Sequence, residues 1–171
     1  MGNKEGDIGS QMREDIGPKV KEQRGFRSFM DVALDEARLA GARGEVPVGA
    51  VVVLGDRIVA QAGNRSREFH DPTAHAEIVA IRAACAALGS ERLAGHDLYV
   101  TLEPCPMCAA ALSAARITRL YYAASDPKSG GIAQGPRLFT HPQCHHVPEV
   151  YDGIAAEASE TLLKQFFADR R

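Results

Sequence analysis

Two short motifs constrain this chain most, because both stand at predicted helix starts and their side chains carry compatible chemistry. His75-Ala76-Glu77 lies near the start of one predicted helix, and Pro104-Cys105-Pro106-Met107-Cys108 lies at the start of another. Cys105 and Cys108 are three residues apart in a first helical turn and therefore face the same side. Helix N-termini also favour thiolates over thiols. Two thiolates and one imidazole then offer three soft ligands to a zinc ion.

The number of ligands points to a catalytic site. A tetrahedral zinc ion with three protein ligands keeps its fourth position for water, whereas structural sites have four protein ligands. Glu77 follows His75 by two residues, close enough to reach that water without binding the metal. Zinc lowers the pKa of bound water toward neutrality, and a neighbouring carboxylate can take the proton and pass it on. H-x-E with P-C-x-x-C is the signature of zinc nucleobase deaminases. The motifs therefore predict a hydrolytic deaminase.

Two other interpretations of the C-x-x-C pair stay open at this point. Cys105 and Cys108 could form a dithiol redox motif at a strand-helix junction, since a strand is predicted over residues 98–102. His75 would then have no role. A non-catalytic zinc or RNA-binding subunit is the second alternative, but a purely structural site has no use for an unligated Glu77. The agreement of H-x-E, the prolines and the helix starts favours the catalytic interpretation.

Composition places these motifs in one globular domain. The 171 residues, 45% of them hydrophobic and 25% charged, suit a single core. No run approaches the roughly 18 consecutive apolar residues of a membrane span. The N-terminus is acidic where a signal peptide begins with basic residues, so we expect a cytoplasmic protein. Four cysteines are too few for a disulfide scaffold and fit a reducing compartment. With a net charge of −2, any RNA affinity must come from a local patch.

Hydrophobic periodicity predicts an α/β domain over residues 26–171, after a disordered tail over residues 1–25. Helices are expected at 26–40, 71–88, 104–116 and 155–171, and strands at 46–54, 57–62, 98–102, 119–124 and 147–151. Asp71 and Pro72 are expected to cap and open the second helix. Leu162, Leu163, Phe166 and Phe167 are expected to face inward from the last one. A hairpin followed by helix-strand alternation gives a mixed sheet with helices on both faces.

From about Phe26 to Arg171, the sequence resembles the bacterial tRNA-specific adenosine deaminases of the cytidine deaminase-like superfamily. Besides the two motifs, the segments that carry the resemblance are Glu45-Val46-Pro47-Val48-Gly49-Ala50, Gly63-Asn64, Asp71-Pro72-Thr73-Ala74, Leu98-Tyr99-Val100-Thr101-Leu102-Glu103, Ala115-Arg116-Ile117 and Phe166-Phe167. The resemblance implies a three-layer α/β/α sandwich with a mixed five-stranded sheet. It also implies a homodimer in which each partner helps to shape the RNA site.

The function implied by this resemblance is the conversion of adenosine to inosine at the wobble position of a tRNA anticodon. A hydroxide bound to one zinc ion per chain would attack C6 of the adenine. Glu77 would protonate N1 and then help ammonia to leave. The alternative within the superfamily is a deaminase of a free nucleobase or nucleoside, such as guanine or cytosine, which would need no RNA contacts.

The resemblance also implies four residues around the base. Asn64 matches the position that hydrogen-bonds the base, and Val48 matches an aliphatic wall of the pocket. The backbone N–H of Ala76 and the carbonyl of Pro104 would complete the recognition. A buried base needs such partners because each unpaired polar edge costs about 1–3 kcal/mol.

Four further residues are implied to contact the RNA. Asp126 matches a position at the RNA entrance, where a carboxylate can accept from a ribose 2′-hydroxyl and so separate RNA from DNA. The alternative is that Asp126 is a turn residue before Pro127. His145 and His146 lie in the loop that would hold the RNA, where an asparagine-histidine pair is common in the family. Phe167 is on the last helix, which the family places near bound RNA. The sequence departs from the family pattern at His145 and also at Ala110, a position where family members often have glycine.

Overall fold

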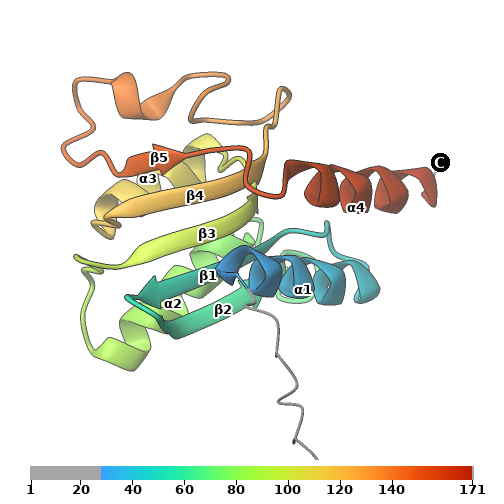
Figure 1. Ribbon diagram of the computed structural model, residues 1–171, viewed down its shortest axis with the longest axis horizontal. Helices are drawn as coiled ribbons and strands as arrows, with labels where there is room; N and C mark the ends of the chain where they lie inside the picture. The colour runs from blue at the N-terminus through green and yellow to red at the C-terminus, as the bar shows by residue number, and fades with distance from the viewer. Residues whose placement is uncertain (1–27, 171) are drawn as a thin grey trace, which may run out of the picture.

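A five-stranded sheet lies between two pairs of helices in the computed structural model, which describes residues 28–170 (Figure 1). In chain order the elements are α1 (Phe29–Ala42), β1 (Gly49–Leu54), β2 (Arg57–Gly63), α2 (Ala76–Leu88), β3 (Asp97–Leu102), α3 (Pro106–Ala114), β4 (Arg119–Ala124), the 3-10 turn η1 (Leu138–Thr140), β5 (Glu149–Tyr151) and α4 (Ala156–Ala168). The tail predicted over residues 1–25 lies outside the described part.

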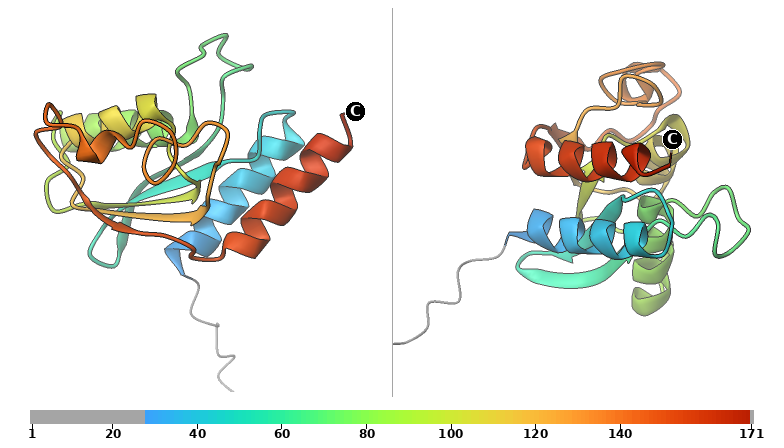
Figure 2. Two further views of the ribbon diagram at one scale, coloured as in Figure 1. Left: turned by 90° about the horizontal axis from the view of Figure 1, so that it is seen from above. Right: turned by 90° about the vertical axis from the view of Figure 1, so that its right-hand side faces the viewer.

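The sheet has the order β2-β1-β3-β4-β5, in which β1 is antiparallel to both neighbours and β3, β4 and β5 are parallel. Helices α1 and α4 lie side by side on one face, and α2 and α3 cover the other (Figure 2). This is the three-layer α/β/α sandwich expected from the sequence. None of the helices within residues 28–170 combines the length and apolar composition needed to cross a membrane.

Strand β1 is buried on both faces, which explains its continuous apolar run. Val52 belongs to the core beneath α2 and α3, whereas Val51 and Val53 pack on the opposite side with Met30 of α1. At Gly49 the contact with α1 is so close that a Cβ atom would lie 2.0 Å from the carbonyl oxygen of Ala33. The first helix is therefore held directly against the strand that leads into the site.

Two of the helices begin later in the chain than the hydrophobic pattern predicts. Helix α2 begins at Ala76, so the predicted cap at Asp71 and Pro72 is wrong. Asp71 Oδ1 instead accepts from the backbone N–H and the hydroxyl of Thr73, which closes a separate turn before the helix. Helix α3 begins at Pro106, two residues after the predicted start. His75 and Cys105 consequently occupy the two N-cap positions.

Helix α4 buries one side only. Phe166 is 8% exposed and lies under the guanidinium of Arg170, whose carbon is 3.7 Å from the ring centroid. Phe167 is 51% exposed, so the expectation that it faces inward is wrong. The helix lies along the edge of α1 and the end of the sheet, and nothing within residues 28–170 covers its outer side.

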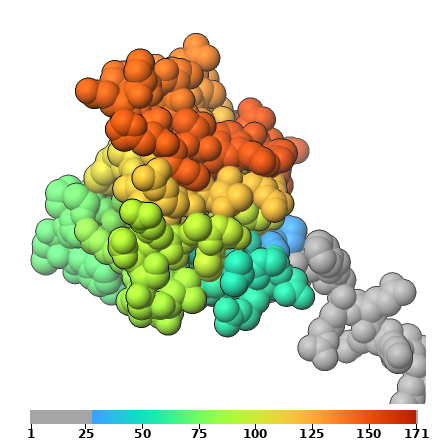
Figure 3. All heavy atoms as spheres, turned by 90° about the vertical axis from the view of Figure 1, so that its left-hand side faces the viewer, coloured from blue at the N-terminus to red at the C-terminus, as the bar shows by residue number. Residues whose placement is uncertain are grey.

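Residues 125–148 connect β4 to β5 as a long segment with the single turn η1. The segment packs beside α3, and its orange residues form the upper part of the face seen in Figure 3. Its last part is tied to α3 because the hydroxyl of Ser113 donates to the carbonyl of His146 at 2.7 Å. The segment predicted as a loop is therefore irregular but anchored.

Candidate metal centre

Three potential metal ligands meet where α2 and α3 begin. His75 Nδ1 lies 3.7 Å from Cys105 Sγ and 3.5 Å from Cys108 Sγ, and all three ligand atoms lie within 4.8 Å of one another. Nitrogen and sulfur bound to one tetrahedral zinc ion are about 3.6 Å apart, given the usual Zn–N and Zn–S bond lengths. The donor set and its spacing therefore fit zinc. It is the one such group of histidine, cysteine or acidic residues found in residues 28–170.

The strand order brings these ligands together. Helices α2 and α3 lie on the same face of the sheet. They follow β2 and β3, which run in the same direction, so both helices begin at the same end of the sheet and their N-termini lie close together. His75 and Cys105 are extended N-cap residues, and Cys108 lies in the first turn of α3. The partial positive charge of two helix N-termini stabilises anionic sulfur. None of the cysteines within residues 28–170 is in a disulfide bond.

Charge at the site is set by burial and by hydrogen bonds among the ligands. A hydrogen bond from Cys108 lowers the pKa of Cys105 to about 4, despite partial burial. The hydrogen bond with Cys105 in turn raises the pKa of His75. Glu77 is only 4% exposed, and burial raises its pKa to about 7. The cluster thus has a thiolate beside an imidazole, and a carboxyl that exchanges its proton near neutral pH.

A cavity of about 200 Å³ opens beside the cluster. It is lined by Val46, Val48, Asn64, His75, Glu77, Leu102, Glu103, Cys105, Asp126 and Ser129. Most of the residues proposed from the sequence for metal binding, proton transfer and base contact therefore line one cavity. Cys108 lies beneath it, completely buried.

The structure shows partners for Ala76 and Pro104 that the sequence did not indicate. The backbone N–H of Ala76 donates to Asn64 Oδ1 at 3.0 Å. The carbonyl of Pro104 accepts the N–H of Gly131 at 2.8 Å. No group within residues 28–170 accepts from the side-chain amide nitrogen of Asn64. This amide is therefore fixed at its oxygen, with two N–H donors left for other partners.

Asp126 has the contacts of a turn residue and also stands at the cavity. Its Oδ1 accepts the backbone N–H groups of Lys128 at 3.1 Å and Ser129 at 3.0 Å, as expected of a turn residue. Its side chain also lines the cavity. The loop bonds use one carboxylate oxygen, so the turn does not exclude a contact with substrate through Oδ2.

Five of the eight proposed substrate-binding residues do not line this cavity: Ala76 and Pro104, described above, and His145, His146 and Phe167. His145 lines a separate cavity of about 440 Å³ between α3 and the segment after η1. His146 donates from Nε2 to the carbonyl of Ile117 at 2.6 Å, so its ring is directed at the protein. Phe167 lies on the outer side of α4.

Sequence reasoning missed two buried carboxylates, Glu45 and Glu103, each 2% exposed. Glu45 Oε1 accepts the N–H groups of Arg67 and Glu68, both at 2.9 Å. Glu103 accepts from the loop after β4. For Glu103 the signal was present in the sequence, because this residue interrupts an apolar run directly before Pro104, whereas Glu45 follows Arg43 and Gly44 and carries no such signal. Such a residue at a strand end must find partners when it is buried.

Comparisons with known proteins agree with this geometry. Residues 24–124 match the family model described as the cytidine and deoxycytidylate deaminase zinc-binding region. Over 143 residues the chain is 62% identical to the tRNA-specific adenosine deaminase of Agrobacterium fabrum, covering 84% of this chain and 94% of that one.

Two solved structures are informative. One, from a study of A-to-I editing by tRNA deaminases at the wobble position of transfer RNA, is 62% identical with a TM-score of 0.78, covering 79% of this chain and 98% of that one. A guanine deaminase from Bacillus subtilis is 33% identical with a TM-score of 0.57, covering 83% and 91%. The motifs, the fold and these matches together show that the chain belongs to the tRNA-specific adenosine deaminases, within the zinc-binding deaminase superfamily.

Proposed function

We propose that this chain is a hydrolase that converts adenosine to inosine at the wobble position of a tRNA anticodon. The observation that carries the proposal is the buried carboxyl of Glu77, which shares one cavity with the ligand cluster of His75, Cys105 and Cys108. A carboxyl that stands beside a three-ligand centre without joining it is what a hydrolytic deaminase requires. The 62% identity to a tRNA-specific adenosine deaminase supports RNA as the substrate.

In this proposal His75, Cys105 and Cys108 hold one zinc ion per chain. Bound there, zinc would supply a water of lowered pKa close to the ring carbon that loses the amine. Glu77 takes a proton at its carboxylate, delivers it to N1 of the adenine, and then assists the departure of ammonia. Its burial excludes bulk water from this transfer.

Base recognition is assigned to the other cavity residues. The Nδ2 amide of Asn64 is free to donate to an acceptor on the base, and Val48 forms an apolar wall. We assign Ala76 an indirect part, since its N–H holds Asn64 Oδ1. The Pro104 carbonyl, which already accepts from Gly131, has a second lone pair for the base.

RNA contacts outside the cavity are assigned to Asp126, His145, His146 and Phe167. Asp126 Oδ2 would accept a ribose 2′-hydroxyl. His145 is exposed and can reach RNA directly, whereas His146 fixes the same segment to the body of the domain through Ile117. The exposed ring of Phe167 offers a stacking surface for an unpaired base. A tRNA substrate also implies that the protein works in the cytoplasm.

A homodimer is the assembly that the family resemblance implies, and it remains a prediction. Multi-angle light scattering of the purified protein tests it. A mass near twice the 18.4 kDa of one chain is expected. A mass of one chain at micromolar concentration would contradict it.

The decisive experiment measures inosine formation on an anticodon stem-loop with adenosine at the wobble position, together with zinc content of the same sample. We expect inosine and about one zinc per chain. A parallel assay uses free adenosine, cytosine and guanine. These free compounds should react far more slowly, because they lack the stem-loop contacts. Inosine absent from a zinc-loaded sample would contradict the proposal.

A free-base deaminase is the second candidate, favoured by the 33% identity to the Bacillus subtilis guanine deaminase. Rapid release of ammonia from guanine, without activity on the stem-loop, would establish it. Thiol-disulfide exchange that survives metal removal would instead support the redox interpretation of Cys105 and Cys108.

A further inference from the structure

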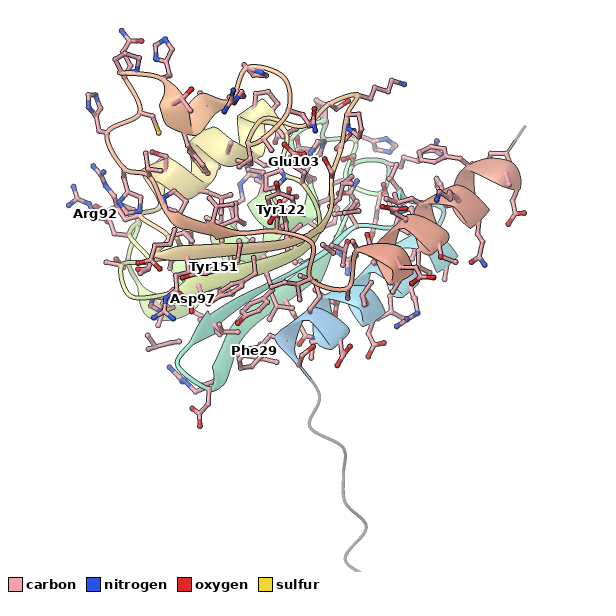
Figure 4. All side chains as sticks on the ribbon, turned by 45° about the horizontal axis from the view of Figure 1, so that its top comes forward. Phe29, Arg92, Asp97, Glu103, Tyr122 and Tyr151 are labelled. Atoms are coloured by element: carbon pink, nitrogen blue, oxygen red, sulfur yellow. The ribbon has the colours of Figure 1, made fainter. Side chains whose placement is uncertain are left out.

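Glu103 is a buried carboxylate that the proposed reaction does not use. It stands between the last residue of β3 and the turn that carries Cys105, and it lies beside Tyr122 in Figure 4. Within residues 28–170, no lysine, arginine or histidine makes an ion pair with it. Hydrogen bonds therefore balance its buried charge.

Five donors surround the two oxygens of Glu103, and all belong to the loop that follows β4. Oε2 accepts from the hydroxyl of Ser125 at 3.1 Å and the N–H of Asp126 at 3.0 Å. Oε1 accepts three consecutive N–H groups, from Ile132 at 3.1 Å, Ala133 at 2.8 Å and Gln134 at 2.9 Å. Successive backbone N–H groups around one oxygen form an anion-binding nest. One side chain thus fixes both ends of the loop.

These contacts keep the carboxylate ionised. Burial acts to raise the pKa of Glu103, but the backbone N–H bonds from Gln134, Asp126, Ala133 and Ile132 outweigh it and hold the pKa below its usual range. With both oxygens engaged, Glu103 is not available as a base, although it lines the cavity.

In the middle of the loop, Gly130 and Gly131 have no side chains, and their backbone packs directly against Glu103 and Pro106, on either side of Cys105. A Cβ atom on Gly130 would lie 2.6 Å from the carboxyl carbon of Glu103, and one on Gly131 would lie 2.6 Å from the nitrogen of Pro106. Gly131 also donates to the Pro104 carbonyl. The position of the loop is therefore defined relative to Cys105.

We propose that Glu103 is a positioning residue that holds the loop of residues 125–134 over the zinc cavity, so that Asp126 and Ser129 meet the substrate in a fixed place. The inference rests on the proposed function for its substrate. Asp126 and Ser129 are the loop residues that line the cavity. Substrate binding depends on Glu103, whereas metal binding by His75 and Cys108 does not.

The first test is hydrogen exchange on the zinc-loaded protein with Glu103→Gln. In glutamine an NH2 group replaces one of the two carboxylate oxygens. This group cannot accept a hydrogen bond from the N–H donors that face it, so one end of the loop is released. We expect the amides of Ile132, Ala133 and Gln134, or that of Asp126, to exchange at least tenfold faster. Glu45→Gln is the matched control, since Glu45 is equally buried and its exchange effect should stay at residues 67–68. Unchanged exchange across residues 125–134 in folded Glu103→Gln overturns the proposal.

The second test is binding of the anticodon stem-loop in a Glu77→Gln background, where the adenosine is not consumed. We expect Glu103→Gln to weaken binding at least tenfold with zinc content unchanged. In the active protein, KM should rise more than kcat falls. Wild-type affinity of Glu103→Gln would overturn the proposal.

Gly130→Ala provides an independent variant if Glu103→Gln fails to fold. The added methyl group displaces the loop without removing the charge, because it meets Glu103 and the carbonyl of Asp126 at 2.6 Å. It should give the same faster exchange and the same rise in KM, and normal values of both would contradict the proposal. If the parent protein neither binds nor deaminates the stem-loop, the proposed function fails, and the exchange experiment still decides whether Glu103 holds the loop.

Discussion

Asn64 Oδ1 accepts a 3.0 Å hydrogen bond from the backbone N–H of Ala76, the residue that separates the ligand His75 from Glu77. This bond settles the orientation of the Asn64 amide, because only its oxygen can accept. The nitrogen of the amide is then the group that remains for a base. The bond also ties the residue after β2 to the first turn of α2.

Asn64→Asp tests this orientation. The aspartate keeps an oxygen for the Ala76 N–H but replaces the amide donor with an acceptor. We expect kcat/KM on the stem-loop to fall about 10- to 100-fold, corresponding to about 1–3 kcal/mol for a lost partner in a buried site. Zinc content should be unchanged. Wild-type kcat/KM would show that Asn64 does not donate to the base.

Glu77→Gln separates proton transfer from metal binding. The variant should retain zinc, measured by inductively coupled plasma mass spectrometry, because Glu77 is not one of the three clustered ligands. Inosine formation should fall by about 10²–10⁴-fold, the usual contribution of a positioned acid or base. Cys105→Ser is the comparison and should lose zinc. Full activity of Glu77→Gln would disprove the proposed mechanism.

Gly49→Ala should destabilise the domain by about 3 kcal/mol or more. The added Cβ would lie 2.0 Å from the Ala33 carbonyl oxygen, so α1 must move away from β1. Gly41→Ala is the control, because its nearest neighbour would be the Pro47 Cβ at 3.3 Å and alanine favours the helix. The free energy of unfolding in urea measures both, and equal values for the two variants would contradict the packing described for Gly49.

The two adjacent rings on α4 should behave differently. Phe166→Ala removes a buried ring and is expected to cost about 3 kcal/mol of unfolding free energy. Phe167→Ala removes a ring that is 51% exposed and should cost less than about 1 kcal/mol. Thermal denaturation compares them. Similar losses would mean that an unseen partner, such as a second chain, covers Phe167.

Tyr99 should make stability fall in alkaline solution. Burial raises its pKa to about 12, whereas a tyrosine in an unfolded chain ionises near 10. The native state therefore keeps a proton that the unfolded state releases, and the stabilisation present below pH 10 is lost as pH rises toward 12. Tyr99→Phe should lose less stability than wild type between pH 9 and 11. Parallel urea midpoints for the two proteins over that range would refute this assignment.

Sequence reasoning succeeded where a pattern is repeated within one element. Strand β4 has the predicted bounds, 119–124, and the ligand cluster was predicted because both of its motifs lie at helix starts. The start of α2 was predicted wrongly because Asp71 can cap either a helix or its own turn, and Thr73 decides between them. Hydrophobic character alone could not show that α4 packs against α1, β3 and β4 with one side only and exposes Phe167.

The missed residues have partners that are distant in sequence. Glu103 contacts N–H groups of residues 125–134, in an irregular loop without hydrophobic periodicity. Periodicity reports which side of a helix or strand is buried, but it says nothing of how a loop folds back. The second cavity beside His145 escaped prediction for the same reason, because it lies between α3 and another irregular segment.

Because Glu103 binds residues 132–134 through their main-chain N–H groups, the path of the loop there depends little on which side chains these residues carry. The carboxylate binds only main-chain N–H groups of Ile132, Ala133 and Gln134, so it makes no demand on their side chains. Ala133 is exposed and can be varied in a library while the loop keeps its course, whereas the side chain of Gln134 donates to the hydroxyl of Ser125 at 3.3 Å. Gly130 and Gly131 admit no such variation. Selection for a different anticodon could therefore act on the surface of this loop without rebuilding the metal centre beneath it.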